Sequence, residues 1–225
     1  MAVLMRSAGV AIGLSLIAGA GHAADVDNQV WSVAHFTTDI GPRTLVTLDT
    51  QARFFDDASR LGQVVFRPAV GLRLSDTTTA FVGYAYVRIS PAGRPVTHEH
   101  RAWQQLTFRA AGDGKGLTLN GRTRVEQRWV EGRDDTGLRV RQQFRLTAPL
   151  TGKVRAVATN ELFFGLNKTD WGQRDGLHLV RSFVGVSVPV REGLSLEPGY
   201  LNQYVVRAGR NGAQHALSVT ANVQF

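Results

Sequence analysis

Apolar and polar residues alternate along most of the chain, and residues 117–147 carry the clearest example. Two runs, 117–131 and 138–147, are joined by the turn-forming sequence Gly-Arg-Asp-Asp-Thr-Gly. In each run one parity is largely apolar, and the other holds the charged residues Arg122, Arg124, Glu126, Arg128, Arg139, Arg141 and Arg145. Successive side chains of a β-strand point to opposite faces. The stretch therefore predicts an antiparallel hairpin with one apolar face and one cationic face.

The same alternation predicts a series of further strands. It is clear in segments 45–55, 62–74, 80–89, 99–109, 154–164, 178–188 and 214–225. Segment 194–206 also reads as a strand, although a bulge at Pro198-Gly199 would shift its parity, and segment 30–38 alternates only weakly. Compact turns and longer loops alternate between the strands, which is typical of outer-membrane barrels. Single-chain bacterial barrels have even strand numbers, so about ten strands are expected, with twelve as the alternative.

The repeated apolar faces decide between two all-β fold classes. A soluble sandwich or calycin-like barrel would have to bury roughly a dozen arginines or expose a whole apolar face, and soluble monomers avoid both. A transmembrane antiparallel up-and-down β-barrel places lipid outside and charge inside. The chain has no cysteine, which agrees with a barrel because a closed ladder needs no disulfide. We therefore expect the membrane barrel.

The charge of the chain comes mainly from arginine. The formal net charge is +8, and the lysines are Lys115, Lys153 and Lys168. A basic chain often binds nucleic acid, but these arginines are spread at period two over many segments instead of being gathered on one helix or loop. No nucleic-acid partner is expected. Arginine suits confined ion pairs because its planar guanidinium takes carboxylates bidentately and stays charged.

The first 23 residues have the pattern of a secretory signal peptide. Arg6 supplies a positive start, residues 10–18 form a short apolar segment, and Gly21-His22-Ala23 is a small-x-small cleavage site. We expect cleavage after Ala23, which leaves residues 24–225 as the barrel. An exported barrel of this kind is expected in the bacterial outer membrane.

Six stretches of the chain carry a resemblance to a known family. They are FDDASRLG at 55–62, GYAYVR at 83–88, HEHRAWQQ at 98–105, RTRVEQR at 122–128, NELFF at 160–164 and GYLNQY at 199–204. With them the chain resembles an uncharacterised bacterial outer-membrane β-barrel family, domain of unknown function 2490. The resemblance implies fold and location, and no activity. The ending ANVQF also resembles the terminal signal read by the barrel-insertion machinery, so that machinery is an expected partner through Phe225.

The inward charges are the first candidates for function. The arginines of inward parity are Arg53, Arg67, Arg73, Arg88, Arg101, Arg109, Arg122, Arg124, Arg128, Arg139, Arg141, Arg145, Arg155 and Arg181. The acids that face them by parity are Asp49, Glu99, Glu126 and Glu161. The surplus of arginine would suit an anion-attracting lumen. A barrel of about ten strands has little free bore, however, so a filled interior is the favoured interpretation.

The second candidates are residues expected near the extracellular rim of the barrel, where the longer loops are expected. They are His98, Glu99, His100, Asp170, His178 and His215. A lipid hydrolase would need a histidine beside a serine and an acid. His100, His178 and His215 share the lipid-facing parity, so contact with lipid headgroups is favoured over catalysis. His98-Glu99-His100 lacks a third convergent ligand, and neither a metal nor a cofactor is expected.

These patterns lead to a functional expectation with two alternatives. The leading one is non-enzymatic: a narrow or plugged, anion-favouring channel, or a structural or binding barrel with an arginine-rich lumen. The other is a hydrolase that modifies lipid A or phospholipid at the extracellular rim. Outer-membrane lipids and lipopolysaccharide are expected partners in either case.

Overall fold

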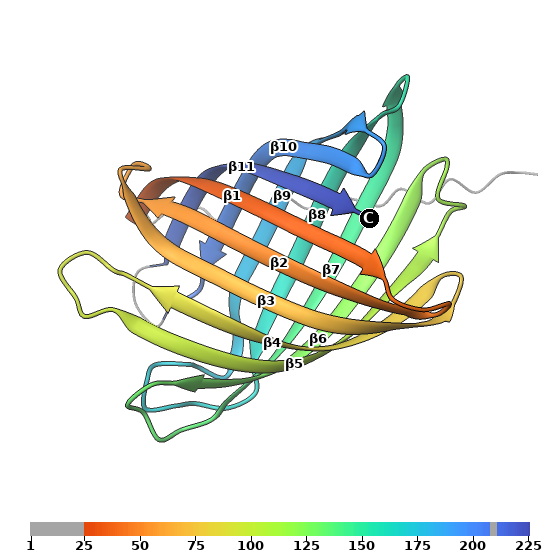
Figure 1. Ribbon diagram of the computed structural model, residues 1–225. Coiled ribbons are helices and arrows are strands. Elements are labelled where there is room, and N and C mark those ends of the chain that lie inside the picture. The colour runs from red at the N-terminus through yellow and green to blue at the C-terminus, as the bar shows by residue number, and fades with distance from the viewer. Residues whose placement is uncertain (1–24, 208–210) are drawn as a thin grey trace, which may run out of the picture.

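The computed structural model describes residues 25–207 and 211–225 of the protein, and the described residues form a closed all-β barrel (Figure 1). The strands are β1 (Asp25–Asp39), β2 (Thr44–Phe55), β3 (Arg60–Ser75), β4 (Thr78–Ile89), β5 (Thr97–Ala111), β6 (Thr118–Val130), β7 (Gly137–Thr151), β8 (Val154–Gly165), β9 (Gly176–Arg191), β10 (Leu194–Val205) and β11 (Gly212–Gln224). Each strand pairs with its neighbours in sequence, as the alternating turns and loops predict. The described residues contain no helix long and apolar enough to cross a membrane.

The expectation of ten strands was wrong by one. The weakly alternating segment 30–38 lies within a full strand, β1, which pairs antiparallel with β2. An odd number of meandering strands brings the first and last together in the same direction. β1 and β11 therefore close the barrel as a parallel pair, from Asp25 beside Gly212 to Thr37 beside Gln224. The alternation of β1 is weak because its inward parity carries Trp31 and Val33 while its outward parity carries Ser32 and Ala34.

Strand parity separates the two faces of the barrel wall. Large apolar side chains stand exposed on the outer face, among them Phe66, Val70, Leu72, Val82, Phe144, Val184, Leu217 and Val219. The inner face holds the buried charged residues. In β10 the parity stays constant from Leu196 to Tyr204, and the register shift lies between Leu194 and Ser195 instead of at Pro198-Gly199. This places Glu197 inside the barrel.

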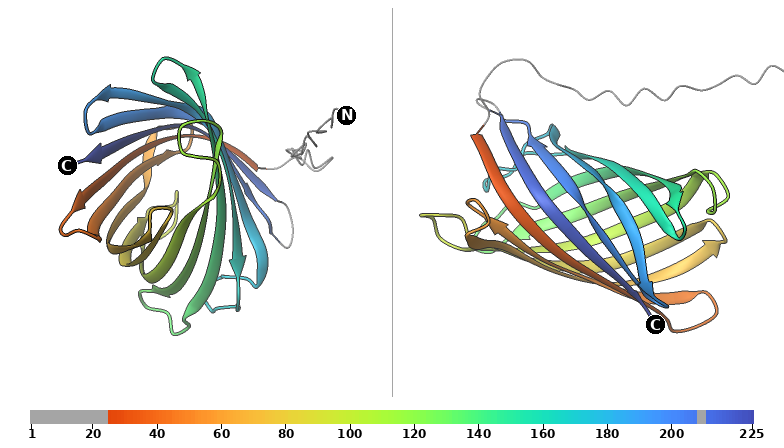
Figure 2. Two further views of the ribbon diagram at one scale, coloured as in Figure 1. Left: turned by 90° about the vertical axis from the view of Figure 1, so that its right-hand side faces the viewer. Right: turned by 90° about the horizontal axis from the view of Figure 1, so that it is seen from above.

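The two ends of the barrel differ in their connections, and the right-hand view of Figure 2 shows the start of β1 and the C-terminus at opposite ends. One end carries the start of β1 and the connections at 56–59, 90–96, 131–136 and 166–175, among which 90–96 and 166–175 are longer than any connection at the other end; we call it the long-loop end. The other carries the compact turns and Phe225; we call it the short-turn end. Because the strand number is odd, the start of β1 and the end of β11 lie at opposite ends.

Candidate functional site

A buried ion-pair network fills the middle of the barrel. Glu126 accepts hydrogen bonds from Arg139 Nε at 2.8 Å and from Arg141 Nη1 at 2.9 Å. Glu161 accepts from Arg141 Nε at 2.9 Å and from Arg122 Nη2 at 2.7 Å. Arg141 thus joins the two carboxylates, and the exposed fractions of Glu126 and Glu161 are 0% and 2%. Neighbouring strands bring these residues together, because β6, β7 and β8 place them at adjacent inward positions of the register.

Two further carboxylates extend the network toward the ends of the barrel. Glu99 accepts from Arg101 Nε at 2.9 Å and from Arg128 Nε at 2.5 Å. Arg145 of β7 donates to both oxygens of Glu197 on β10, at 2.8 and 2.5 Å. In the barrel wall, β8 and β9 lie between β7 and β10, so the Arg145–Glu197 pair bridges part of the interior.

Arginines without a close carboxylate partner bond to glutamine amides and stack on aromatic rings. Arg124 donates to Gln105 Oε1 at 2.8 and 2.5 Å, and Arg181 donates to Gln203 Oε1 at 3.0 and 2.6 Å. The guanidinium carbon of Arg124 lies 4.1 Å from the ring centroid of Trp103. An aromatic face attracts a cation, so these contacts partly compensate the arginine surplus.

Most sequence-predicted interior residues lie on the inner face of the wall. Those in the central network are Arg101, Arg122, Arg124, Glu126, Arg128, Arg139, Arg141, Arg145, Glu161 and Arg181. Arg73, Arg109 and Arg155 also have inward parity but lie toward the short turns, where Arg155 bonds the carbonyl oxygens of Lys115 and Gly116. The inward placement of Arg88 was wrong: it shares its parity with Tyr84, which is exposed on the outer face, and it pairs in register with His98.

The rim histidines on the outer face bond to tyrosines. His98 Nδ1 lies 2.5 Å from the Tyr86 hydroxyl, and His100 Nδ1 lies 2.5 Å from the Tyr84 hydroxyl. His100 Nε2 also contacts Glu131 at 3.0 Å. His215 makes the same kind of pair with Tyr200. Within residues 25–207 and 211–225, no hydrogen bond joins a serine to a histidine, so this part of the chain shows no serine–histidine–acid triad.

His178 does not have the lipid-facing position that its parity predicts. The β8–β9 register steps from Phe163 beside Leu179 to Phe164 beside Leu177, which leaves His178 in a bulge. Its ring packs edge-on against Phe163, at 6.4 Å between centroids, and Phe163 is a buried interior residue. A bulge re-aims a side chain, which parity counting cannot detect.

The 166–175 loop reaches into the long-loop end of the interior. Asp170 accepts hydrogen bonds from the backbone nitrogens of Asp134 and Asp135 at 3.4 and 3.3 Å. Gln173 is buried and its Oε1 accepts from Arg128 at 2.9 Å. A Cβ at Gly137 would come within 2.5 Å of the Trp171 ring, so glycine there allows the loop to pack against β7. The loop therefore narrows this end of the barrel.

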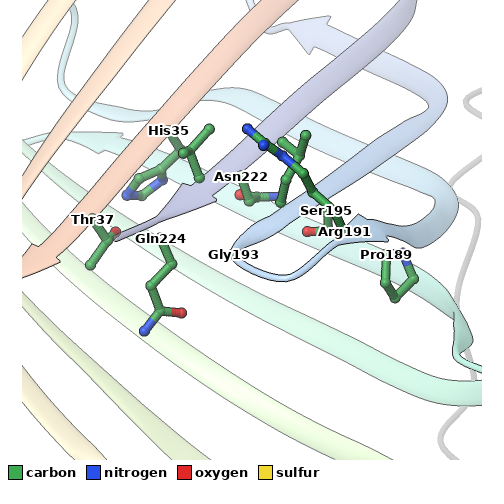
Figure 3. A pocket seen from close by; sticks show the side chains of 10 residues that line it. His35, Thr37, Pro189, Arg191, Gly193, Ser195, Asn222 and Gln224 are labelled. Atoms are coloured by element: carbon green, nitrogen blue, oxygen red, sulfur yellow. The ribbon is translucent and has the colours of Figure 1, made fainter.

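A pocket of about 400 Å³ opens at the short-turn end (Figure 3). Its polar lining comes from β1, β9, β10 and β11: His35, Thr37, Arg191, Ser195, Asn222 and Gln224. His35 and Asn222 are partners in the parallel β1–β11 pairing. We call this pocket the vestibule. Sequence reasoning did not find it, because it depends on the parallel closure and on the place of β1.

Other parts of the site were also missed from the sequence. The glutamines Gln51, Gln63, Gln105 and Gln203 share the inward parity of the arginines that they bond, so parity alone could have indicated them. No simple sequence signal pairs Arg145 with Glu197, because these residues are not adjacent on the wall. Within the described residues, no group of three histidine, aspartate or glutamate side chains could hold a metal ion.

Comparison with known proteins gives a family and a relative. Residues 28–214 match the model of a family described as "Protein of unknown function (DUF2490)". An uncharacterised protein of Methylorubrum extorquens is 36% identical over 204 residues, which cover 88% of this chain and 88% of that protein. No solved structure matches the chain.

Proposed function

We propose that this chain, which belongs to the DUF2490 family of proteins of unknown function, is an outer-membrane barrel with a closed interior. It serves as a structural or binding barrel of the cell envelope and not as an open channel. The observation that carries this proposal is the burial of Glu126 and Glu161 among arginines from β6 and β7. Side chains that bridge the interior leave little room for a continuous file of water and ions.

The outer face supports the membrane environment. A band of exposed apolar side chains on a soluble monomer would be an aggregation liability, whereas lipid covers such a band. All four tyrosines, Tyr84, Tyr86, Tyr200 and Tyr204, and also Trp129, have outward parity in the half of the wall nearer the long loops. Tyrosine and tryptophan prefer the membrane–water interface because they combine an apolar ring with a polar atom. The long-loop end then faces the cell exterior and the short turns face the periplasm.

Export and insertion belong to the same proposal. The signal pattern of residues 1–23 lies outside the described residues and remains the basis for expecting export. Phe225 directly follows β11, and the residue is 79% exposed. An accessible terminal aromatic at the periplasmic end fits a signal that the barrel-insertion machinery reads. Lipopolysaccharide and other outer-membrane lipids would surround the outer face.

Conductance across a planar bilayer tests the closed interior. The refolded barrel is expected to be silent under a salt gradient. The double variant Arg145→Ala/Glu197→Ala removes both ends of the interior bridge without leaving a lone charge, and it is expected to show brief openings. Discrete, anion-preferring openings of the unmodified barrel would contradict the closed interior and make the arginines a selectivity lining.

A further inference from the structure

The vestibule contains polar side chains that the rest of the molecule does not use. Within the described residues, none of the side chains of His35, Thr37, Arg191, Ser195, Asn222 and Gln224 makes a hydrogen bond to another residue. The central network is different, because each of the carboxylates of Glu99, Glu126 and Glu161 is held by at least two arginines. A set of free donors around a pocket is an arrangement that can bind a polar ligand.

The barrel interior behind the vestibule is rich in arginine. His35 of β1 pairs in register with Asp49 of β2, and Asp49 pairs in turn with Arg67 of β3. The nearby acid is Asp49, and its Oδ1 is already held by Arg67 at 3.2 Å and by Gln51 at 2.9 Å. Arg122 keeps 24% of its side chain exposed while it bonds Glu161. The charge there is therefore not fully compensated.

Two arginine nitrogen atoms of the barrel interior lack hydrogen-bond acceptors. Arg67 Nε and Arg124 Nη1 are buried and have no hydrogen-bond partner. The nearest carboxylate oxygen to Arg124 Nη1 is Glu126 Oε1, at 3.8 Å, which is too far for a hydrogen bond. A buried N–H group without an acceptor is costly, so added negative charge near these two nitrogen atoms is favourable.

From these observations we infer that the vestibule binds a phosphate group, with Arg191 at its exposed rim and His35 as a further donor in its lining. Arginine, histidine, asparagine, glutamine, serine and threonine supply the donors that a multiply charged oxyanion accepts from. A volume of about 400 Å³ also leaves room for a small organic part beside the phosphate. The group belongs either to a soluble phosphate compound or to a lipid headgroup. The inference rests on the proposed barrel, whose closed interior would make the vestibule a dead-end binding site.

Calorimetric titration of the purified barrel in non-ionic detergent tests this inference. The probes are inorganic phosphate, glycerol phosphate and dihexanoyl phosphatidic acid, with chloride at equal ionic strength as the reference. Saturable binding is expected for at least one phosphate probe. Arg191→Gln and His35→Gln should each weaken it about tenfold or more, because each removes a charge-assisted or polar hydrogen bond. Arg94→Gln removes one positive charge at the long-loop end and should leave binding unchanged.

The outcomes distinguish a soluble phosphate compound from a lipid headgroup. Together with the conductance experiment, they also distinguish failure of the vestibule site from failure of the closed-interior proposal. Binding of the inorganic or glycerol form supports a soluble ligand, and binding of the lipid form alone supports a headgroup. Absence of saturable binding, or an equal loss in Arg94→Gln, would overturn the site. If a barrel that is silent in the bilayer fails to bind phosphate, the vestibule inference alone is wrong. If a conducting barrel binds phosphate at Arg191, the closed-interior proposal alone is wrong.

Discussion

Arg141 lies between two buried carboxylates and shows how the interior is stabilised. Its Nη1 donates to Glu126 and its Nε donates to Glu161. Each carboxylate has a second arginine partner, so the charges alternate through the middle of the barrel. Taking such charges out of water is expensive, and their hydrogen bonds offset that cost only while every partner is present.

Removal of one carboxylate from this network should strongly destabilise the barrel. Glu126→Ala removes an acceptor from Arg139 and Arg141, and Glu161→Ala removes one from Arg122 and Arg141. We expect each variant to lose about 3–5 kcal/mol in the free energy of unfolding. Urea unfolding of the refolded barrel in detergent measures it. Glu131→Ala is the control, because its side chain is 57% exposed and pairs with His100, and it should change stability by less than about 0.5 kcal/mol. Unchanged stability in both network variants would refute the network as a stabilising element.

Parity predicted the face of individual residues better than it predicted their partners. It was wrong for Arg88, which lies on the outer face. The arginines that are buried in the structure, and that parity assigned inward, are Arg53, Arg67, Arg101, Arg124, Arg139 and Arg141. In β4 the inward positions are taken by Ala85 and Val87 while Tyr84 and Tyr86 point outward, so the polar parity faces out. The sequence supplied no comparable rule for pairing Arg124 with Gln105 or Arg145 with Glu197, because partners depend on register and on distance across the interior.

At the scale of elements, the 166–175 loop is tied to the 131–136 loop. Asp170 receives two backbone hydrogen bonds and its own nitrogen donates to Asp135 Oδ2 at 2.7 Å. The Trp171 Nε1 donates to the Asp135 carbonyl oxygen at 2.9 Å, and the guanidinium of Arg128 lies 4.9 Å from the Trp171 ring. Sequence reasoning placed Asp170 at the rim but did not indicate these contacts, because irregular loops carry no periodic signal.

Loss of the Asp170 carboxylate should loosen both loops. In Asp170→Ala, the amides of Asp134 and Asp135 lose their acceptor, and we expect their hydrogen exchange to become about tenfold faster. Hydrogen–deuterium exchange with mass spectrometry of peptides from both loops measures this. Asp175→Ala should exchange like the unmodified protein, because Asp175 is exposed and lies 3.9 Å from Lys168. Equal exchange in both variants would show that Asp170 does not hold the loops together.

For the whole molecule, the odd strand number determines the arrangement of the chain ends. β1 starts at the long-loop end and β11 finishes at the short-turn end. In an outer membrane with periplasmic short turns, the start of β1 would face the outside of the cell. A ten-stranded barrel would place both ends on the periplasmic side, so the two strand numbers make opposite predictions.

Single-cysteine labelling in intact cells can decide this topology, since the chain has no cysteine of its own. A membrane-impermeant maleimide should label Asn28→Cys at the start of β1 as readily as Ala92→Cys in a long loop. Glu192→Cys, in a short turn, should be labelled only after the outer membrane is permeabilised. All three positions are exposed. Labelling of Asn28→Cys only after permeabilisation would contradict the parallel closure of β1 and β11.

The sequence by itself determined the all-β class, ten of the eleven strands and the cationic inner face. These follow from period-two alternation, which is a local property of a pleated chain. The tertiary structure decided the eleventh strand, the parallel β1–β11 pairing, the inward turn of His178 and the vestibule around His35 and Arg191. Each depends on which strands become neighbours when the barrel closes or on one bulged residue. Such contacts join positions far apart in the chain, and hydrophobic periodicity does not record them.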